Sequence, residues 1–344
     1  MPELVSILIP AYNAEKWIGD TIRSALNQTW PNKEIIIVDD GSTDNTLKVA
    51  KKFESTVVKV IAQENAGACG ARNKALSFAQ GSYVQWLDAD DLLAPDKISQ
   101  QLKESGSGYS SRVLFGSAFG TFFFRHQKAK FVPNSLWHDL APVEWIITKF
   151  NNNIWMNPAV WLVSRELADL AGLWDERLSL DDDGEYFCRV VASSERVEFV
   201  PEAKSYYRVG NTGSLSKRTS YKACESLLLS LTLCFEHLLL LENSERTRSA
   251  CLKYLKIWLP YFYPEKPKLM NRMNDLAHEL GGRLPPPEVS WKYYPIERVM
   301  GWEIAKKVMT CWRSVKSKSY KNWDRLLYHL TYKTSSLDSM IHSS

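Results

Sequence analysis

The sequence predicts an α/β protein: a doubly wound, largely parallel sheet followed by a helical extension. Two observations over the first hundred residues carry this prediction. Short apolar runs rich in β-branched residues alternate with segments whose apolar residues recur at helical spacing. The apolar runs lead into loops of Gly, Asp, Asn or Ser, as expected where parallel strands open onto a ligand site. Beyond residue 220 the helical spacing dominates, with leucines three and four residues apart.

The first four predicted strands are short and alternate with helices. A strand at residues 4–9 stops at Pro10, and its apolar character suits burial on both faces. Similar runs follow at residues 34–38, at 57–61 and from Tyr83 onward. Helices are expected to begin at Glu15, near Asp44, near Gly67 and near Pro95. Right-handed crossovers would bring the carboxyl ends of these strands to one edge of the sheet.

The next hundred residues have a less regular pattern. Strands are expected at residues 113–115, 121–124, 158–164 and 196–201, and helices at 145–150, at 165–171 and from about Asp181. The loop 151–158 is rich in Asn and carries Trp155. Amides and an indole can hydrogen-bond to a sugar and stack on it, although a plain surface turn would have the same composition.

Composition limits the class of protein without assigning a function. The 344 residues are 45% hydrophobic and 24% charged, and a net charge of +4 is too small to argue for nucleic-acid binding. The six cysteines form no CxxC pair, so we expect neither a zinc site nor a disulfide framework, and a reducing cytoplasmic setting. We expect no signal peptide. The longest apolar run, residues 227–241, is interrupted by polar residues, so no membrane-spanning helix is expected.

Three carboxylates crowd the end of the fourth strand: Asp88, Asp90 and Asp91 lie within four positions. Ionising all three costs free energy unless a cation lies among them. Oxygen ligands of this kind suit Mg²⁺ or Mn²⁺. A solvated acidic turn that caps the next helix would give the same pattern.

The loops at the predicted sheet edge together favour a nucleotide site. They carry Tyr12 with Asn13, Asp39 with Asp40, Arg72, and the triplet Asp88, Asp90 and Asp91. An aromatic ring, hydrogen-bonding carboxylates, a guanidinium and a metal suit a nucleoside diphosphate. No GxGxxG follows the first strand and no GxxxxGK[ST] occurs, which disfavours a nicotinamide dehydrogenase and a P-loop phosphotransferase.

A second acidic segment, residues 181–185 with the sequence DDDGE, opens a predicted helix. The exposed N–H groups of a first helical turn stabilise carboxylates, which alone would explain their presence. A positioned carboxylate of this kind can also act as a general base.

Four motifs in order resemble the N-terminal half of family 2 glycosyltransferases, which have the GT-A fold. They are VSILIPAYN at residues 5–13, VDDGSTD at 38–44, NAG at 65–67 with ARN at 71–73, and LDADD at 87–91. Together they are far more specific than any one alone. The resemblance implies a GT-A type doubly wound mixed sheet, Rossmann-like, and an inverting transfer from a nucleotide sugar.

The resemblance also implies a role for each loop. Tyr12 would lie against the nucleobase, Asp40 would accept from the base beside Asp39, Arg72 would approach the base or phosphates, and Asp88 would lie near the ribose. The implied nucleotide-binding set is Pro10, Ala11, Tyr12, Asn13, Asp39, Asp40, Arg72 and Asp88. Asp90, with Asp88, would bind the divalent metal, Mn²⁺ or Mg²⁺.

Aligning the second acidic segment with the family on Arg189 makes Asp183 the implied catalytic base and Asp182 the preceding acid. The family commonly has Glu at the position of Asp182, and three consecutive Asp leave the base open between Asp183 and Asp182. Contacts to the donor or acceptor sugar are expected from Asp91, Trp155, Asn157 and Glu185. Many relatives have a His where this chain has Gly210. The metal or phosphate contact of that His would here be made by a residue such as Ser214, Ser216, Lys217 or Arg218.

We therefore expect a hexosyltransferase-type enzyme that moves a sugar, favouring a UDP donor, to a carbohydrate or lipid-linked acceptor in glycan or polysaccharide synthesis. Residues 1–220 would be the catalytic domain, with a nucleotide-binding half at 1–100 and an acceptor and base half at 101–220. A helical extension at 221–280 would follow. Residues 281–344 would hold a linker and basic helices containing Trp. These helices would either lie on an anionic membrane, making the protein peripheral at its inner face, or pack on the protein.

Two other classes remain open. A sugar nucleotidyltransferase could share the layered fold and the acidic metal site, but it needs a Gly/Arg/Lys-rich loop after the first strand, and residues 10–15 lack one. A non-catalytic nucleotide-sugar binding protein would keep the N-terminal loops without needing the second acidic segment.

Overall fold

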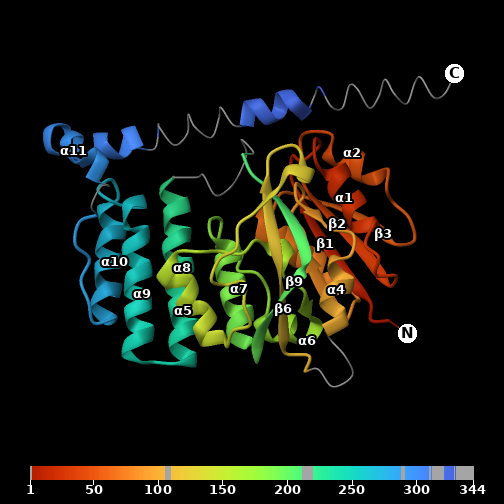
Figure 1. Cartoon of the computed structure of the whole chain (residues 1–344), viewed down its shortest axis with the longest axis horizontal. Helices are drawn as coiled ribbons and strands as arrows, with labels where there is room; N and C mark the ends of the chain where they lie inside the picture. The colour runs from red at the N-terminus through yellow and green to blue at the C-terminus, as the bar shows by residue number, and fades with distance from the viewer. Residues whose placement is uncertain are drawn as a thin grey trace.

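The computed structural model describes residues 2–104, 110–210, 220–287, 291–309, 311, 321–328 and 330. Two sheets form its centre, and helices pack around and beyond them (Figure 1). The first sheet has the strand order β3-β2-β1-β4-β8. Its strands are β1 (Val5–Ala11), β2 (Lys33–Asp40), β3 (Val58–Gln63), β4 (Tyr83–Trp86) and β8 (Val163–Ser164), and β8 alone in this sheet is antiparallel.

Successive side chains of the central strand pack on opposite helical layers. Ile7 shares a core with the buried face of α1 (Ile18–Leu26), whereas Leu8 belongs to the opposite core with Ala75 of α3 (Gly67–Phe78). The helix α2 (Thr46–Lys51) lies on the α1 side, where it buries Ala50. Both faces of the sheet are therefore covered, which confirms the doubly wound arrangement.

The second sheet has the order β5-β9-β6-β7 and contains the two longest strands. They are β6 (Val113–Phe122) and β9 (Arg196–Arg208), which run parallel, with β5 (Leu92–Leu93) and β7 (Lys130–Phe131) antiparallel at the edges. The expected strands 113–115 and 121–124 are thus one strand. Gly116, Ser117 and Gly120 break its apolar pattern but lie inside the sheet, where a side chain on Gly120 would collide with the ring of Phe131. The expected strand 158–164 begins with a 3₁₀ turn at Pro158–Val160, and only its last two residues pair with β4.

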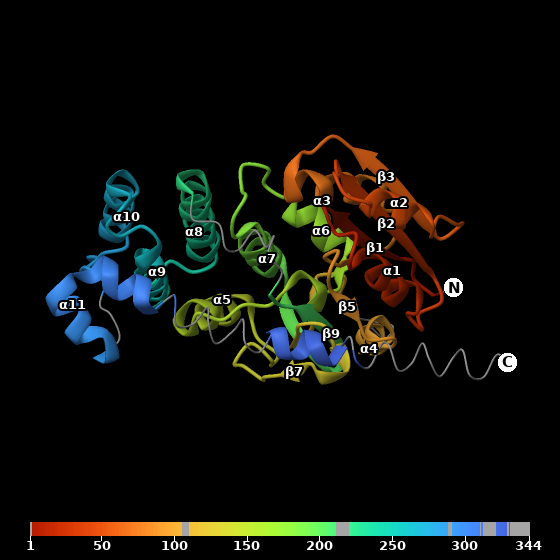
Figure 2. The same cartoon turned by 90° about the horizontal axis from the view of Figure 1, so that it is seen from above.

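The remaining helices pack beside the second sheet and continue away from it (Figure 2). They are α4 (Lys97–Glu104), α5 (Pro142–Asn152), α6 (Arg165–Ala171), α7 (Asp182–Ser193), α8 (Tyr221–Leu241), α9 (Glu245–Trp258), α10 (Pro267–Glu279) and α11 (Tyr294–Met300). Short 3₁₀ turns occupy His126–Lys128, Pro158–Val160, Leu259–Tyr261 and Trp291–Tyr293. One continuous core runs from Trp86 in the first sheet through Tyr186 and Leu227 to Met273 in α10. The helical extension is therefore joined to the sheets by shared packing.

The helix α8 is the one element among the described residues that is long and apolar enough to cross a membrane by length and composition. Half of its most apolar window is buried against the rest of the protein, as in a core helix. Residues 283–287 form no regular element, and the expected linker there stays a prediction. After it, α11 and the helical residues 302–309 and 321–328 lie along one side of the molecule (Figure 1).

Candidate active site

The end of β2 supplies two neighbouring carboxylates with different surroundings. Asp40 accepts hydrogen bonds from Gln63 Nε2 (2.7 Å), Ala66 N (2.8 Å) and Gly67 N (2.9 Å), so it caps the start of α3. Asp39 is 2% exposed; its Oδ2 accepts from Ser42 N (3.2 Å), but its Oδ1 is buried without a partner among the described residues. A buried carboxylate oxygen without a donor indicates a ligand that supplies one. Asp40 caps α3 with its carboxylate, and the expectation that it also accepts from a base stays a prediction.

The loop after β1 lies beside this pair. Asn13 adopts a left-handed conformation (φ 50°) and its Oδ1 accepts from Thr43 N (2.8 Å), while its own N–H donates to Ser42 Oγ (3.0 Å). These bonds join the loops after β1 and β2. Tyr12, next to Asn13, remains half exposed, while Ala11 is buried and Pro10 half-buried. The predicted nucleotide loops thus meet at one edge of the sheet.

Arg72 joins the two acidic segments. Its Nη2 lies 3.0 Å from Asp88 Oδ1, its Nη1 lies 2.5 Å from Asp182 Oδ2, and its guanidinium stacks 4.2 Å from the ring centre of Trp174. The burial of Arg72 opposes its positive charge, but the two carboxylates outweigh it and raise the pKa of Arg72. Arg72 is 6% exposed and bridges residues 88–91 and 181–183, and its expected approach to the nucleotide stays a prediction.

The triplet after β4 divides into a buried member and two at the surface of the site. Asp91 is fully buried, and its carboxylate accepts from Arg208 N (2.8 Å) and Asn157 Nδ2 (3.4 Å). Burial and the charges of Asp90 and Asp88 raise the pKa of Asp91. Asp91 and Asn157, which is 1% exposed, therefore hold the loop in place, and the expected contact of each with a sugar stays a prediction. Asp88 and Asp90 stay partly exposed.

The donor set at Asp88 and Asp90 fits a divalent cation only in part. Two partly exposed carboxylates beside a buried third one concentrate negative charge, which a cation would neutralise. Within the described part of the chain, no group of three or more His, Cys, Asp or Glu side chains could hold a metal ion. Mg²⁺ is commonly held by one or two carboxylates together with substrate phosphates, and this donor set agrees with that pattern.

The start of α7 separates the roles of its two candidate bases. Asp182 is 9% exposed, and its Oδ2 pairs with Arg72. Asp183 Oδ1 accepts from Gly184 N (2.9 Å), and we find no other hydrogen bond to its carboxylate within the described ranges. Burial and the charges of Asp182 and Asp181 raise the pKa of Asp183 to about 7. Asp183 is therefore a carboxyl group that can take up a proton near neutral pH.

Tyr207 of β9 lies between the two acidic segments. Burial raises the pKa of Tyr207, and so do the charges of Asp91, Asp183, Asp88 and Asp90 in that order. Carboxylates from both segments therefore act on one phenol, which places the residues after β4 and the start of α7 around a single site. The ring of Tyr207 contacts that of Trp155, with ring centres 5.1 Å apart.

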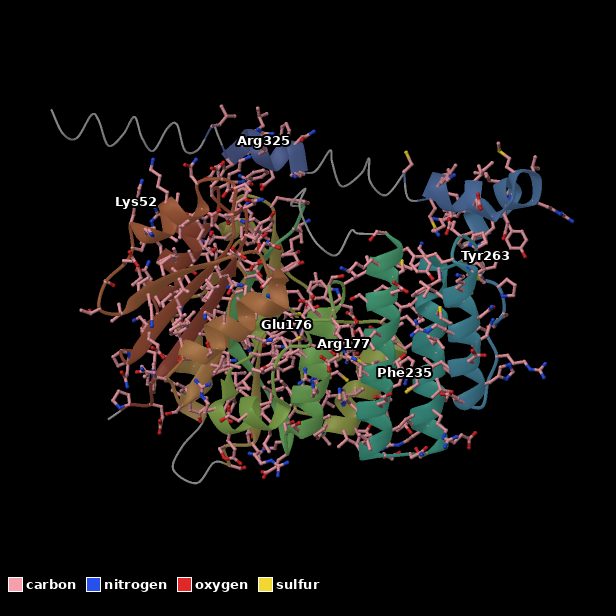
Figure 3. The ribbon with its side chains drawn as sticks, turned by 180° about the vertical axis from the view of Figure 1, so that it is seen from behind. Lys52, Glu176, Arg177, Phe235, Tyr263 and Arg325 are labelled. Atoms are coloured by element: carbon pink, nitrogen blue, oxygen red, sulfur yellow. The ribbon has the colours of Figure 1, made fainter. Side chains whose placement is uncertain are left out.

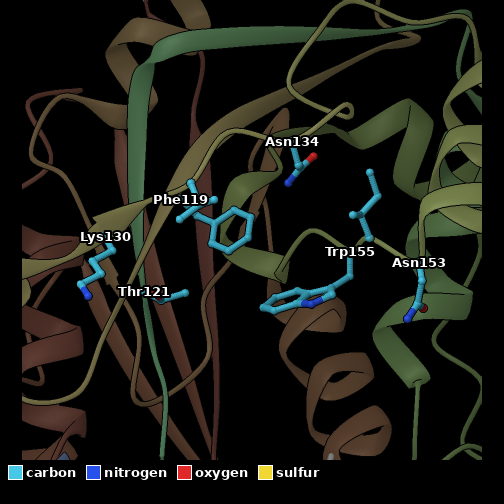
Figure 4. A pocket seen from close by; sticks show the side chains of 8 residues that line it. Phe119, Thr121, Lys130, Asn134, Asn153 and Trp155 are labelled. Carbon is cyan, nitrogen blue, oxygen red and sulfur yellow. The ribbon is translucent and has the colours of Figure 1, made fainter. Parts of the chain in front are cut away.

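Trp155 also lines a pocket of about 200 Å³ (Figure 4). The side chain of Trp155 is 47% exposed, and its ring lies 5.3 Å from that of Phe119. The remaining lining residues are Thr121, Lys130, Val132, Asn134, Asn153 and Ile154. An aromatic wall with nearby amides is suited to a sugar ring.

Glu185 links α7 to α8. It is 2% exposed and pairs with Arg189 Nε (2.8 Å) and His237 Nε2 (3.1 Å), which ties α7 to α8. Burial opposes its ionisation, but the bonds from His237 and Arg189 outweigh burial and lower the pKa of Glu185. The expected contact of Glu185 with a sugar stays a prediction. Residues 211–219, which include Ser214, Ser216, Lys217 and Arg218, lie outside the described residues.

Several residues of the site were not predicted. Arg208 donates from Nε to Asp90 O (2.8 Å) and stacks 4.0 Å from the ring centre of Trp17, which fixes the backbone beside Asp90. Tyr207 and Trp174 were also missed. The only signal for these residues was their position next to a strand end or an acidic segment, which many structural residues share.

The fold and these loops define a protein of the GT-A type. Residues 6–151 match the model for "Glycosyl transferase family 2". TuaG of Bacillus subtilis, which carries the name of a teichuronic acid biosynthesis glycosyltransferase, is 40% identical over 155 residues, or 42% of this chain and 59% of TuaG. WfgD of Escherichia coli, a "UDP-Glc:alpha-D-GlcNAc-diphosphoundecaprenol beta-1,3-glucosyltransferase", is 43% identical over 100 residues, or 29% of this chain and 40% of WfgD. The chain therefore spans well under two thirds of these relatives.

The fold is also that of S. aureus TarS 1-349, solved in complex with UDP-GlcNAc. The TM-score is 0.62 at 19% identity, over 80% of both chains, so this likeness concerns the fold alone. Residues 6–151 of the chain therefore match glycosyltransferase family 2, and the curated relatives and the fold agree with this match.

Proposed function

We propose that this protein is an inverting glycosyltransferase that moves a sugar from a nucleoside-diphosphate donor to a carbohydrate or lipid-linked acceptor. One observation carries the proposal. Arg72 joins the acidic loop after β4 to the acidic start of α7, so the carboxylates that we propose for binding the donor lie next to a carboxyl group whose pKa is about 7. Relatives whose names include glycosyl transfer support it.

Asp183 is proposed as the catalytic base. A sugar hydroxyl attacks the anomeric carbon only as it loses its proton, and a carboxylate with a pKa near the working pH accepts that proton efficiently. Asp182 is held by Arg72, which leaves Asp183 as the better acceptor. The new bond forms opposite the departing diphosphate, so the anomeric configuration inverts without a covalent intermediate.

The donor would bind along the loops after β1 and β2. The buried Oδ1 of Asp39 would accept the N–H of a base such as uracil, and the half-exposed ring of Tyr12 would cover that base. UDP donors are named for WfgD and for the TarS complex, and on that ground we propose a UDP-sugar here.

Asp88 and Asp90 would hold a divalent cation, Mg²⁺ or Mn²⁺, together with the donor phosphates. When bound, such an ion stabilises the negative charge that develops on the departing diphosphate. Arg72 holds Asp88 in place, and Arg208 fixes the backbone at Asp90 through its bond to Asp90 O. The acceptor sugar would stack on Trp155, in the pocket that this residue lines.

The products released separate this proposal from its alternatives. Purified protein is incubated with Mn²⁺, a panel of nucleotide sugars and a mixture of glycoside acceptors. Release of nucleoside diphosphate, which Asp183→Asn abolishes and the exposed control Glu176→Gln does not, supports glycosyl transfer (Figure 3). Release of pyrophosphate would identify a nucleotidyltransferase. Binding without release of either product would identify a non-catalytic nucleotide-sugar binding protein.

We also propose that the C-terminal helices lie on the inner surface of an anionic membrane. Residues 291–344 hold ten Lys or Arg against four Asp or Glu. Large apolar side chains are exposed on the described helices of this region: Tyr294, Val299, Met300, Ile304, Val308, Trp323, Leu326 and Leu330. Arg325, beside them, lies at the outer edge of the molecule (Figure 3). Basic charge among exposed apolar groups complements anionic headgroups above an acyl layer.

Contacts orient this surface relative to the site. Asp324 accepts from Phe124 N (3.0 Å) and pairs with Arg125 Nε (2.8 Å), and Tyr328 packs on Phe124. Flotation with phosphatidylglycerol vesicles tests the proposal. The double variant Trp323→Ser/Leu326→Ser should lose flotation, whereas Leu240→Ser, on an 84% exposed side chain of α8, should keep it. Equal flotation of both variants would exclude the helix 321–328 as a membrane contact.

A further inference from the structure

The helical extension holds the acidic segment through two buried serines of α8. Ser226 Oγ accepts from Ser179 N (2.7 Å) and Leu180 N (3.0 Å) and lies 3.1 Å from Leu180 O. One turn further along α8, Ser230 Oγ lies 2.9 Å from Asp181 O and 2.7 Å from Asp181 Oδ2, so its hydrogen is shared between two acceptors. Ser226 is 3% exposed and Ser230 is fully buried.

These bonds act at the residue where α7 begins. Asp181 has φ 60° and ψ 30°, a left-handed conformation that non-glycine residues rarely adopt unless their surroundings enforce it. Its carbonyl oxygen also accepts from Glu185 N (3.2 Å) at the start of the helix. Ser230 therefore bonds to the oxygen that helps set the start of α7. The next two residues are Asp182 and Asp183.

Neighbouring groups leave this turn little freedom. A side chain at Gly184 would collide with the Asp181 carboxylate, and the buried Lys149 of α5 donates from Nζ to Gly184 O (3.1 Å). Asp181 is in turn one of the charges that raise the pKa of Asp183. The position of Asp181 thus affects both the direction of the Asp183 side chain and the pKa of its carboxyl group.

We infer that Ser226 and Ser230 are positioning residues for the base: the extension α8 holds the turn before α7 so that Asp183 faces the site. This inference rests on the proposed role of Asp183 in glycosyl transfer. It gives the helical extension a part in the reaction, exerted through Asp181. The relevant chemistry is the hydroxyl group at position 230, since Ser230 bonds to both polar groups of Asp181 that face α8.

The first test compares Ser230→Ala with Thr232→Val. Thr232 lies on the same helix, but its hydroxyl bonds within the helix to Leu228 O (2.9 Å), so its loss controls for removal of a hydroxyl from α8. With the UDP-sugar that supports turnover, Ser230→Ala should lower kcat at least tenfold and keep the Kd for UDP within twofold, and Ser230→Thr should restore part of kcat. Equal kcat for the two variants, or a parallel loss of UDP binding, would overturn the inference.

The second test does not require turnover. The melting temperature is measured between pH 4 and pH 8 with and without Asp183→Asn, once in the wild-type chain and once with Ser230→Ala. The effect of Asp183→Asn should depend on pH in the wild-type chain and much less with Ser230→Ala, because a displaced Asp183 would return towards an ordinary pKa. An unchanged pH dependence would refute the positioning role. If Asp183→Asn instead leaves full activity, the proposed base fails while this measurement still reports on the turn.

Discussion

Asp183→Asn should stabilise the protein at alkaline pH while it abolishes transfer. The pKa of Asp183 is raised from the usual 3.8 to about 7, chiefly by burial and then by the charges of Asp182 and Asp181. A carboxyl group with a higher pKa in the native than in the unfolded chain binds its proton more tightly in the native state. Stability therefore falls as pH rises from about 4 to about 7, and the full loss is present above that window.

The size of this effect follows from the pKa. A shift from 3.8 to about 7 corresponds to at most about 4 kcal/mol of native-state stability at pH 8. Asn has no charge to bury, so the variant avoids this loss at pH 8 and differs little from the wild type below pH 4. For a chain of this size, about 4 kcal/mol corresponds to a melting temperature higher by up to about 8 °C.

The assay is a thermal melt of both proteins at pH 4 and pH 8, with Asp182→Asn as the matched control. Asp182 pairs with the buried Arg72, so Asp182→Asn should lower the melting temperature at both pH values, by an amount equivalent to about 3 kcal/mol. A melting temperature for Asp183→Asn at pH 8 at or below that of the wild type would refute the raised pKa. A stabilising Asp182→Asn would move the base role to Asp182.

Three further predictions concern the donor and acceptor. Asp39→Ala should weaken UDP binding about tenfold to a hundredfold in calorimetry, because the base loses its carboxylate acceptor. Asp40→Ala should mainly lower the melting temperature, because α3 loses its cap. Asp90→Ala should abolish both turnover and Mn²⁺-dependent donor binding, and full turnover of the wild type in EDTA would exclude the metal. Trp155→Ala should raise the acceptor KM about tenfold and leave the donor KM unchanged, while Trp155→Phe should keep most of the affinity for the acceptor. An equal acceptor KM for the two variants would contradict the stacking of the acceptor sugar on Trp155.

The elements that could be predicted are those set by local pattern. The strands from Val5 and Lys33 are recognisable as buried because their central residues are almost all apolar, and the loops after them carry polar groups in a fixed order. Because parallel strands end at a common edge, the sequence alone predicts that Asp39, Asp88 and Tyr12 lie near one another. The strand β6 was split by prediction because its buried Gly and Ser lack the apolar signal.

The roles within the site could not be predicted, since they depend on contacts between distant residues. Asp39 and Asp40 are adjacent residues of the same type. Only the hydrogen bonds from Gln63 and from the start of α3 show that Asp40 is the one bonded within the protein. The roles of Asp182 and Asp183 likewise differ because Arg72, more than a hundred residues away in the chain, pairs with Asp182. The bond from Ser230 to Asp181 joins an apolar helix to an acidic turn, and neither segment carries a signal for the other.

The continuous core described above sets a limit on how this chain can be divided. The motifs end near residue 220, but Leu227, Phe235 and Tyr254 from beyond that point fill the same interior as Trp86 and Tyr186. A fragment that ends with the motifs would expose a large hydrophobic surface to water, and we expect such a fragment to aggregate. A chimera that transfers the N-terminal catalytic region to another protein would therefore have to include α8.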